Sequence, residues 1–337
     1  MNTGRRVAGR LCAVLGLLLP GPVAAAMPPG AAAADYTVNT FSSTFDTSQV
    51  DMANSTKSGY KWYISRHAAS VTPQSSVLLN NDGSVTLEYT SASNDGMATA
   101  GMVKGGWIGT VFGGGGYFEA TLKFDPDMVT NRAKGFPAWW SIAIEHFARS
   151  VTGQTSQWPG QPPGFEHYIE PDFFEWNIDG VDKVPPKTYN GSMIDWSGIW
   201  TRAHGMPVSK QTPWTTKWNT TPSTTDFRQY HKYGWLWVPA TATTKGYAQY
   251  YFDDQPTTDR VSWTQYTNQE PTPAQQMDPW TFGILDQQHL MLILGSGDRG
   301  AMTVESVTVW QKSDRYNGKD GVIPPFDAQN ATARAPS

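Results

Sequence analysis

The stretch HYIEPDFFEWN, residues 167–177, carries three carboxylates in the spacing E-x-D-x-x-E, at Glu170, Asp172 and Glu175. The chain has 337 residues but only eight glutamates, so this concentration of acid is unusual for it. The residues between the acids are mostly aromatic or aliphatic and favour burial. We therefore expect a central β-strand that packs one face on the core.

The positions of the three acids on this strand require an irregularity. Side chains alternate along a strand, so Glu170 and Asp172 share one face, whereas strict alternation would send Glu175 into the core. Burying a lone carboxylate is costly. A β-bulge at Phe173 and Phe174 inserts one residue and returns Glu175 to the face of the other acids. The sequence thus predicts three acids on one open face of a bulged strand.

The rest of the chain has the pattern of an all-β protein. No segment keeps a helical apolar period over three turns, and short β-like runs alternate with clusters of Gly, Pro, Asn, Ser and Thr. We expect strands at residues 84–90, 117–124, 138–144, 168–178, 232–238, 246–252, 290–295 and 302–310. Eight or more strands with long loops are typical of a double-sheet sandwich, or jelly roll.

We divide the chain into three parts. Residues 1–34 have the pattern of an export signal, residues 35–314 show no internal linker and form one domain, and residues 315–337 form an extended or disordered tail. The apolar run of the signal is too short to span a bilayer. Arg5 and Arg6 leave both the general secretory and the twin-arginine route open. We therefore expect a secreted or periplasmic protein with no membrane segment after signal removal.

Several classes of function are excluded by composition. The net charge of −4 and the lack of a basic run argue against a nucleic-acid partner. The single cysteine, Cys12, lies in the signal, so the mature chain has no thiol chemistry and no disulfide framework. The run GGGG at residues 113–116 precedes a strand and is predicted to be a turn, and no H-E-x-x-H or G-x-S-x-G motif occurs. We predict no metal site and no required cofactor.

The acidic motif resembles that of glycoside hydrolase family 16, the laminarinase, lichenase and agarase group, whose signature is E-x-D-x-x-E on a bulged central strand. Four further segments resemble strand regions of the family in the same order: VKGGWIGTVFGGGGYFEATLKF, FPAWWSI, YHKYGWLWVP and MTVESVTVWQ. The resemblance implies a concanavalin-like β-sandwich (jelly roll) with a concave substrate cleft. Pro171 departs from the family, in which Ile or Leu is usual at this position.

The resemblance also implies a role for each acid. Glu170 stands at the position of the nucleophile, Glu175 at that of the acid/base and Asp172 at that of the helper carboxylate between them. Such a pair of glutamates hydrolyses a glycosidic bond by double displacement with retention of configuration. The expected substrate is a β-linked polysaccharide cleaved internally, a β-1,3- or β-1,3/1,4-glucan first and a galactan such as agar second. We expect a monomer, and the resemblance leaves open whether a structural calcium ion is bound.

Aromatic and polar residues near the motif are predicted to bind sugar, since sugars offer flat apolar faces ringed by hydroxyls. The candidates are Trp139, Trp140, Tyr168, Asn177, Gln288 and His289. Trp139 and Trp140 are adjacent, so one of them faces the core and the other the cleft. Residues 153–164 and 186–225 are predicted to be long loops that wall the cleft, the second of them carrying four tryptophans: Trp196, Trp200, Trp214 and Trp218.

Three alternatives share this fold class or this site. A non-catalytic, lectin-like carbohydrate-binding protein can have the same sandwich architecture, because a fold does not determine a function. A polysaccharide lyase would use a Tyr, His, Arg and Asn site on an anionic uronate. A transglycosylase would use the same acids but pass the sugar to an acceptor other than water.

Overall fold

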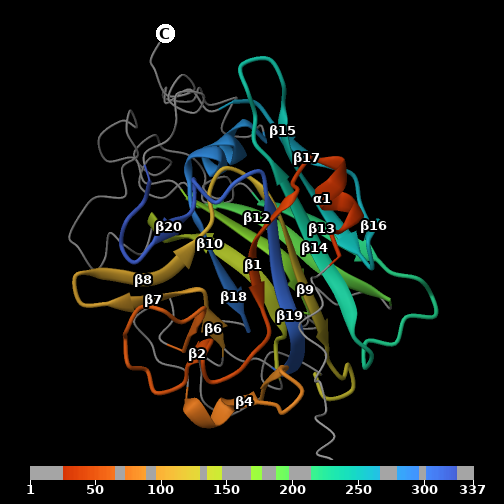
Figure 1. Ribbon diagram of the computed structural model, residues 1–337. Helices are drawn as coiled ribbons and strands as arrows, with labels where there is room; N and C mark the ends of the chain where they lie inside the picture. The colour runs from red at the N-terminus through yellow and green to blue at the C-terminus, as the bar shows by residue number, and fades with distance from the viewer. Residues whose placement is uncertain are drawn as a thin grey trace, which may run out of the picture.

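The computed structural model describes residues 26–64, 73–88, 96–129, 135–145, 168–176, 187–196, 214–265, 279–295 and 301–324. These residues form an all-β fold dominated by antiparallel sheets (Figure 1), which confirms the predicted fold class. No helix in these ranges has the length and apolar character needed to cross a membrane.

Two large sheets and one small sheet account for the strands of the described ranges. The outer sheet has the order β16 (Gln255–Pro256), β15 (Gly246–Phe252), β14 (His231–Val238), β9 (Gly116–Lys123), β19 (Met302–Gln311), β5 (Val85–Leu87) and β4 (Val77–Leu79), with β1 (Val38–Ser43) on β19 and β17 (Val261–Trp263) on β15. The acid-bearing sheet has the order β13 (Trp214–Thr220), β12 (Thr188–Trp196), β11 (Tyr168–Glu175), β10 (Ala138–Ala143), β18 (Leu290–Leu294), β6 (Met97–Ala98), β3 (Trp62–Tyr63) and β2 (Val50–Asp51). The small sheet consists of β20 (Gly318–Lys319), β8 (Gly106–Val111) and β7 (Ala100–Val103). Short helices are α1 (Pro29–Ala33) and the 3₁₀ helices η1 (Gln74–Ser76) and η5 (Pro279–Gln287).

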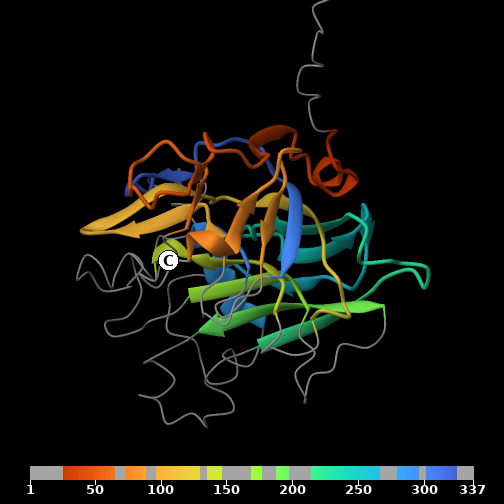
Figure 2. The same cartoon turned by 90° about the horizontal axis from the view of Figure 1, so that it is seen from below.

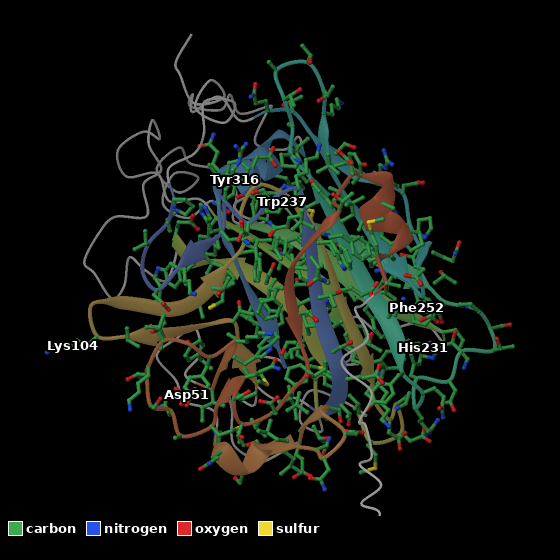
Figure 3. All side chains as sticks on the ribbon, in the orientation of Figure 1. Asp51, Lys104, His231, Trp237, Phe252 and Tyr316 are labelled. Atoms are coloured by element: carbon green, nitrogen blue, oxygen red, sulfur yellow. The ribbon has the colours of Figure 1, made fainter. Side chains whose placement is uncertain are left out.

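The core lies between the outer sheet and the acid-bearing sheet, which form two layers when the molecule is seen from below (Figure 2). Aromatic rings fill this space. Phe173 of β11 stacks on Trp235 of β14 at 4.7 Å between ring centroids, and Phe174 meets Tyr233 at 4.4 Å. Alternation along β14 directs Tyr233, Trp235 and Trp237 into this interior, where side chains are densely packed (Figure 3). Aromatic contacts across the core therefore pack the two sheets against each other.

The carboxylate of Asp286 joins three separate segments. It accepts hydrogen bonds from the indole nitrogens of Trp237 at 2.8 Å and Trp263 at 2.9 Å, and from the backbone N–H of Ala240 at 2.9 Å. Buried indole N–H groups need acceptors. Asp286 therefore fixes η5 against β14 and β17.

All eight predicted strands are present, but the predicted long loop at residues 186–225 is wrong. It contains β12 and β13, which pair with each other over seven residue pairs, from Thr188 with Thr220 to Ile194 with Trp214. On β12, Tyr189 and Met193 face the core while Asn190 and Ser192 face the other side. The many Ser, Thr and Asn residues hid this alternation in the sequence. The other predicted loop, residues 153–164, lies outside the described residues.

The ends of the folded domain also differ from the prediction. Helix α1 buries Ala31 against Tyr117 and Tyr251 of the outer sheet, so the packed structure begins before residue 35. At the other end, β20 pairs with β8, and Asp320 Oδ1 accepts a 2.8 Å hydrogen bond from the Gly109 N–H. The predicted start of an extended tail at residue 315 is therefore wrong, because residues 315–324 complete the small sheet. Residues 1–25 and 325–337 lie outside the described ranges.

Candidate active site

Strand β11 contains a bulge at the predicted place. Asp172 lies opposite Ser192 of β12, and Glu175 lies opposite Asn190, so three steps along β11 match two steps along β12. One extra residue in a strand defines a β-bulge and reverses the alternation beyond it. Glu175 therefore returns to the face that carries Asp172.

The bulge absorbs its extra residue into the core. Against β10, Trp139 lies opposite Phe174 and Trp140 opposite Asp172, which leaves Phe173 without an opposite residue. Phe173 and Phe174 are both fully buried in the core between the two large sheets. The apolar side chains thus explain why the strand bulges, since both rings reach the interior and neither acid is buried there.

Asp172 is the most buried of the three acids, with 3% of its surface exposed. Its Oδ2 accepts a 2.6 Å hydrogen bond from the hydroxyl of Ser192. Burial raises the pKa of Asp172 well above its ordinary value, and the charges of Glu175 and then Glu170 raise it further, while the Ser192 hydrogen bond acts in the opposite direction. Asp172 is therefore held toward its neutral form when its neighbours are ionised.

Glu175 has two polar partners on the neighbouring strand. Its Oε2 accepts a hydrogen bond from Asn190 Nδ2 at 3.1 Å and lies 3.5 Å from Ser192 Oγ. Ser192 and Asn190 were not among the predicted site residues, because they lie in the segment interpreted as a loop. Alternation of Tyr189 and Met193 with polar residues was the signal that could have found them.

Glu170 completes the acid row. It lies opposite Ile194 of β12, is partly exposed, and shares the sheet face of Asp172. Glu175 is likewise partly exposed. The site thus consists of a buried aspartate between two glutamates that remain accessible. This arrangement can place one carboxylate as a nucleophile and another as a proton donor on the same sugar ring.

The two adjacent tryptophans of β10 face opposite sides of the sheet, as alternation requires. Trp139 is fully buried and packs against Phe173 at 5.1 Å between ring centroids, so its predicted role in sugar binding is wrong. Trp140 lies opposite Asp172 on the acid face, and its indole N–H donates a 2.8 Å hydrogen bond to the Gly295 carbonyl. Only 9% of Trp140 is exposed. Its contact with sugar stays a prediction.

Two other predicted sugar-binding residues lie in the interior. The Gln288 side chain is fully buried, and its Oε1 accepts a 3.0 Å hydrogen bond from the Ile169 N–H. His289 is 1% exposed, and its Nδ1 lies 2.7 Å from Glu145 Oε1. Side chains so buried do not reach a sugar, so both predictions are wrong. Gln288 and His289 directly follow η5, and the chain turns their side chains toward the interior there. Tyr168 is partly buried on the acid face and stays a prediction, and Asn177 lies outside the described residues.

The small sheet packs on the acid-bearing face over β10 and β18. Trp107, Met102 and Val111 of β7 and β8 pack with Trp140 of β10 and Ile293 of β18 in a separate apolar cluster. Aliphatic side chains over β10 and β18 are thereby removed from water. The small sheet therefore forms a wall beside β11, on the side away from β12.

Among the four tryptophans of the segment predicted to be a loop, Trp218 is the one whose side chain is described. It lies on β13 opposite Asn190 and is 39% exposed. Trp196 and Trp214 belong to β12 and β13, but their side chains are not described, and Trp200 lies outside the described residues. Trp218 thus belongs to the acid-bearing sheet rather than to a loop.

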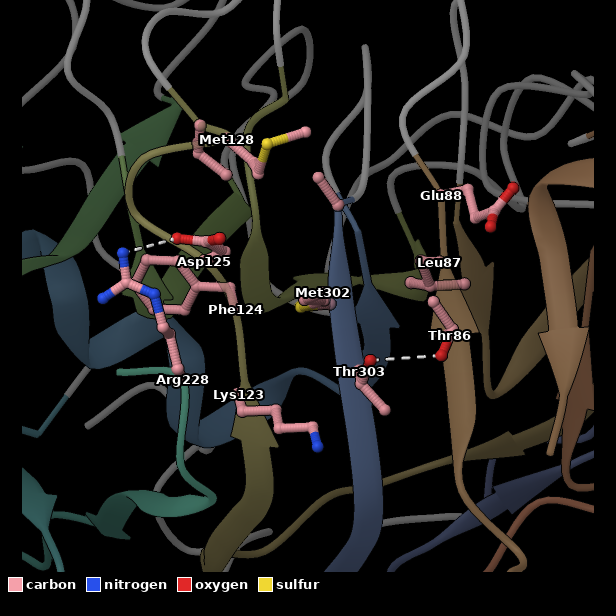
Figure 4. A pocket seen from close by; sticks show the side chains of 12 residues that line it. Thr86, Leu87, Glu88, Lys123, Phe124, Asp125, Met128, Arg228, Met302 and Thr303 are labelled. Carbon is pink, nitrogen blue, oxygen red and sulfur yellow. Dashed lines mark hydrogen bonds and ion pairs between the residues drawn. The ribbon is translucent and has the colours of Figure 1, made fainter. Parts of the chain in front are cut away.

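A separate pocket of about 660 Å³ opens at one end of the outer sheet (Figure 4). Residues of β5, β9 and β19 line it, together with Arg228, which pairs with Asp125 at 3.0 Å. Thr86 and Thr303 share a 3.1 Å hydrogen bond at its rim. None of the three acids lines this pocket, so it is distinct from the acid site.

The described part of the chain shows no cluster of metal-ligating side chains. No group of three or more His, Cys, Asp or Glu residues in those ranges is arranged to hold a metal ion. The absence of a metal site and of a required cofactor stays a prediction, and so does the possible structural calcium ion.

Comparisons with known proteins give structural neighbours. The endo-1,3-beta-glucanase from Streptomyces sioyaensis is 18% identical and matches 85% of this chain and 98% of its own, with a TM-score of 0.46. The catalytic domain of an endo-1,3-beta-glucanase (laminarinase) from Thermotoga petrophila RKU-1 is 15% identical over 64% of this chain and 68% of its own, with a TM-score of 0.35. The exoplasmic/lumenal domain of VIP36, in a Ca2+/Man3GlcNAc-bound form, is 9% identical over 76% of this chain and 85% of its own, with a TM-score of 0.30. No family model matches the chain, and no curated protein is significantly similar to it.

Proposed function

We propose that this protein is a glycoside hydrolase that cleaves a β-linked polysaccharide internally and retains the anomeric configuration. The observation that carries the proposal is the bulge in β11, which places Glu170, Asp172 and Glu175 on one sheet face. Two accessible carboxylates that flank a sugar ring are the machinery of retaining glycosidases. The E-x-D-x-x-E spacing on a bulged strand is also the signature of glycoside hydrolase family 16, to which we assign the chain.

In the proposed first step, the Glu170 carboxylate attacks the anomeric carbon while Glu175 donates its proton to the leaving glycosidic oxygen. This step forms a covalent glycosyl-enzyme and releases one part of the polysaccharide. In the second step, Glu175 removes a proton from water, which attacks the anomeric carbon and frees Glu170. Two inversions at the same carbon give net retention.

Asp172 acts in this proposal by limiting the negative charge of the site. Three ionised carboxylates on one strand face would repel one another. Burial and the neighbouring charges raise the pKa of Asp172 and so favour its neutral form beside ionised neighbours. A neutral Asp172 adds no charge beside Glu170, the proposed nucleophile, or Glu175, the proposed acid/base.

The proposed substrate is a β-1,3- or β-1,3/1,4-glucan, with a galactan such as agar as the second choice. The basis is the family resemblance of the motif. We propose further that the chain is exported, that it acts as a monomer, and that it needs no cofactor. A polysaccharide substrate is extracellular in most settings, which agrees with the signal-like pattern at the N-terminus.

The test is a reducing-sugar assay of the protein on laminarin, lichenan, agarose, carrageenan and xyloglucan. Glu170→Gln and Glu175→Gln are measured beside the wild type, and Glu305→Gln, an exposed glutamate on the outer sheet, serves as the matched control. We expect wild type and Glu305→Gln to release reducing ends, and both active-site variants to lose activity by several orders of magnitude while keeping the far-ultraviolet circular dichroism of the wild type. The anomer formed first, followed by proton NMR, should be the β form.

The remaining outcomes separate the alternatives. Substantial turnover by both active-site variants would overturn the assignment of the acids. Retention of the protein on an affinity gel of one glycan, without release of reducing ends, would favour a lectin-like binding protein. An unsaturated product that absorbs in the ultraviolet would indicate a lyase, and longer oligosaccharides formed in the presence of an acceptor sugar would indicate a transglycosylase.

A further inference from the structure

Trp218 lies in the same cross-strand row as Glu175. Glu175 of β11 is opposite Asn190 of β12, and Asn190 is opposite Trp218 of β13. Residues directly opposite each other in antiparallel strands project from the same sheet face. Strands are 4.7–4.9 Å apart, so the backbone of Trp218 is about 10 Å from that of Glu175. The indole therefore stands on the acid face, two strands from the acid/base.

Among the described residues, the acid-bearing face is covered on one side of β11 and uncovered on the other. On one side of β11, the small sheet packs Trp107 and Met102 over β10 and β18. On the other side, β12 carries the small polar side chains of Ser192 and Asn190, and β13 is the edge strand of the sheet within the described ranges. A chain lying across the strands toward β13 passes over these two residues and arrives at Trp218.

Trp218 has the exposure of a binding residue. The described tryptophans of the core are nearly inaccessible, whereas Trp218 is 39% exposed. The flat face of an indole matches the apolar face of a sugar ring, and its N–H can bond a hydroxyl at the rim of such a contact. Asn190, between Trp218 and Glu175, also has a buried Oδ1 for which the described residues supply no hydrogen-bond donor. A buried acceptor of this kind favours an ordered water as its partner.

We propose that Trp218 is the sugar-stacking platform of an outer subsite, which binds the polysaccharide at a sugar residue beyond the scissile bond on the β13 side. This inference rests on the proposed function, because it extends the same site. It makes Trp218 a determinant of substrate length rather than of bond cleavage. Long chains reach the platform, whereas a short substrate bound at the acids does not.

The test compares Trp218→Ala and Trp218→Phe with the wild type on the polysaccharide that the wild type cleaves and on its oligosaccharides of increasing length. Loss of the indole should lower kcat/KM on the polysaccharide about tenfold, mainly through KM, since one aromatic contact of this kind contributes of the order of one tenfold factor in affinity. The shortest substrate that is cleaved should show no change. Phe should restore most of the loss. Leu78→Ala, which alters an exposed apolar residue of the outer sheet, should match the wild type on every substrate.

Failure of this inference can be told apart from failure of the proposed function. Equal loss for Trp218→Ala on all chain lengths, or no loss on any, would overturn the subsite while hydrolysis dependent on Glu170 stands. If the wild type shows no turnover, the subsite is tested by binding instead. The migration of wild type and variants is then compared in native gels that contain each polysaccharide of the panel. Retardation that Trp218→Ala weakens and Trp218→Phe preserves would support the platform. Equal retardation of Trp218→Ala and wild type, or retardation by no glycan, would overturn it.

Discussion

Ser192 and Asp172 face each other across β12 and β11, and the Ser192 hydroxyl donates a 2.6 Å hydrogen bond to Asp172 Oδ2. The same hydroxyl oxygen lies 3.5 Å from Glu175 Oε2. One side chain that is fully buried thus touches two of the three acids. Because a hydroxyl has a single proton to donate, Ser192 couples the protonation of Asp172 to the environment of Glu175.

Ser192→Ala should reduce kcat/KM by about 10-fold, the equivalent of losing one buried hydrogen bond. The hydrogen bond favours the ionised form of Asp172, so its loss should raise the pKa of Asp172 further. The limb of the pH–rate profile that contains this titration should therefore move to higher pH. Rates of the purified variant measured from pH 4 to pH 9 check both expectations.

Ser192→Thr is the control for that variant because it keeps the hydroxyl. Partial recovery of the rate together with the wild-type pH profile would identify the hydroxyl as the active feature. A Ser192→Ala profile of unchanged shape, with only a lower plateau, would mean that Ser192 supports the strand pair without tuning the acids.

The bulge depends on Phe173, which is fully buried between Trp139 at 5.1 Å and Trp235 at 4.7 Å. Phe173→Ala should lower the free energy of unfolding by about 3–5 kcal/mol, because it removes a large buried ring and leaves a cavity. Urea unfolding followed by tryptophan fluorescence measures the loss. Leu78→Ala, at an exposed position, should change stability by less than about 0.5 kcal/mol. A loss of similar size in both variants would show that Phe173 is not a core residue.

The bulge itself could be predicted from the sequence, because only one extra residue reconciles two facts. Phe173 and Phe174 both need burial, and Glu175 cannot be buried alone. Local chemistry thus determined the side-chain directions on β11. The partners of the acids could not be found in this way, since Ser192 and Asn190 are about 15 to 20 residues distant in sequence and meet the acids only through strand pairing.

The burial of polar residues at the ends of strands could also not be predicted from the sequence. Gln288 and His289 are polar residues before an apolar run, which is the pattern of an exposed strand end. The structure instead turns them inward after η5, where the Ile169 N–H and the Glu145 carboxylate satisfy them. Both partners come from segments more than a hundred residues away. A hydrogen bond to a partner so distant in sequence produces no local sequence pattern. Polarity alone therefore suggested an exposed environment instead of a buried one.

Asp286→Asn should destabilise the fold through the two indoles that it binds. The carboxylate accepts three hydrogen bonds, from Trp237, Trp263 and the Ala240 N–H, whereas an asparagine offers one acceptor oxygen and turns two donors toward the same N–H groups. Each donor left unpaired costs about 1–3 kcal/mol. Urea unfolding measures this loss, and the exposed Asp259→Asn is the matched control. Equal stability of Asp286→Asn and Asp259→Asn would contradict the role of Asp286 in fixing η5 against β14 and β17.

Glu119 should make the stability of the protein depend on pH near neutrality. This residue lies on the outward face of β9, is 6% exposed, and its Oε2 accepts a 3.2 Å hydrogen bond from the Tyr117 hydroxyl. Burial raises the pKa of Glu119 from 4.5 to about 7, although the nearby Lys232 opposes the shift. In the unfolded chain the same group titrates near its ordinary value. Between these two pH values the folded state binds a proton that the unfolded state has lost.

The sign of the effect follows from this difference. Stability is greatest below the pKa of the unfolded chain and falls as the pH rises through the folded value, because the buried group must then ionise. A shift of this size corresponds to about 3 kcal/mol. Glu119→Gln cannot ionise, so its stability relative to the wild type should rise by about that amount between pH 4.5 and pH 8. Urea unfolding of both proteins across this range, with the exposed Glu305→Gln as control, measures the difference in the free energy of unfolding. If the free energies of unfolding of Glu119→Gln and wild type change in parallel with pH, Glu119 is not the source of the pH dependence.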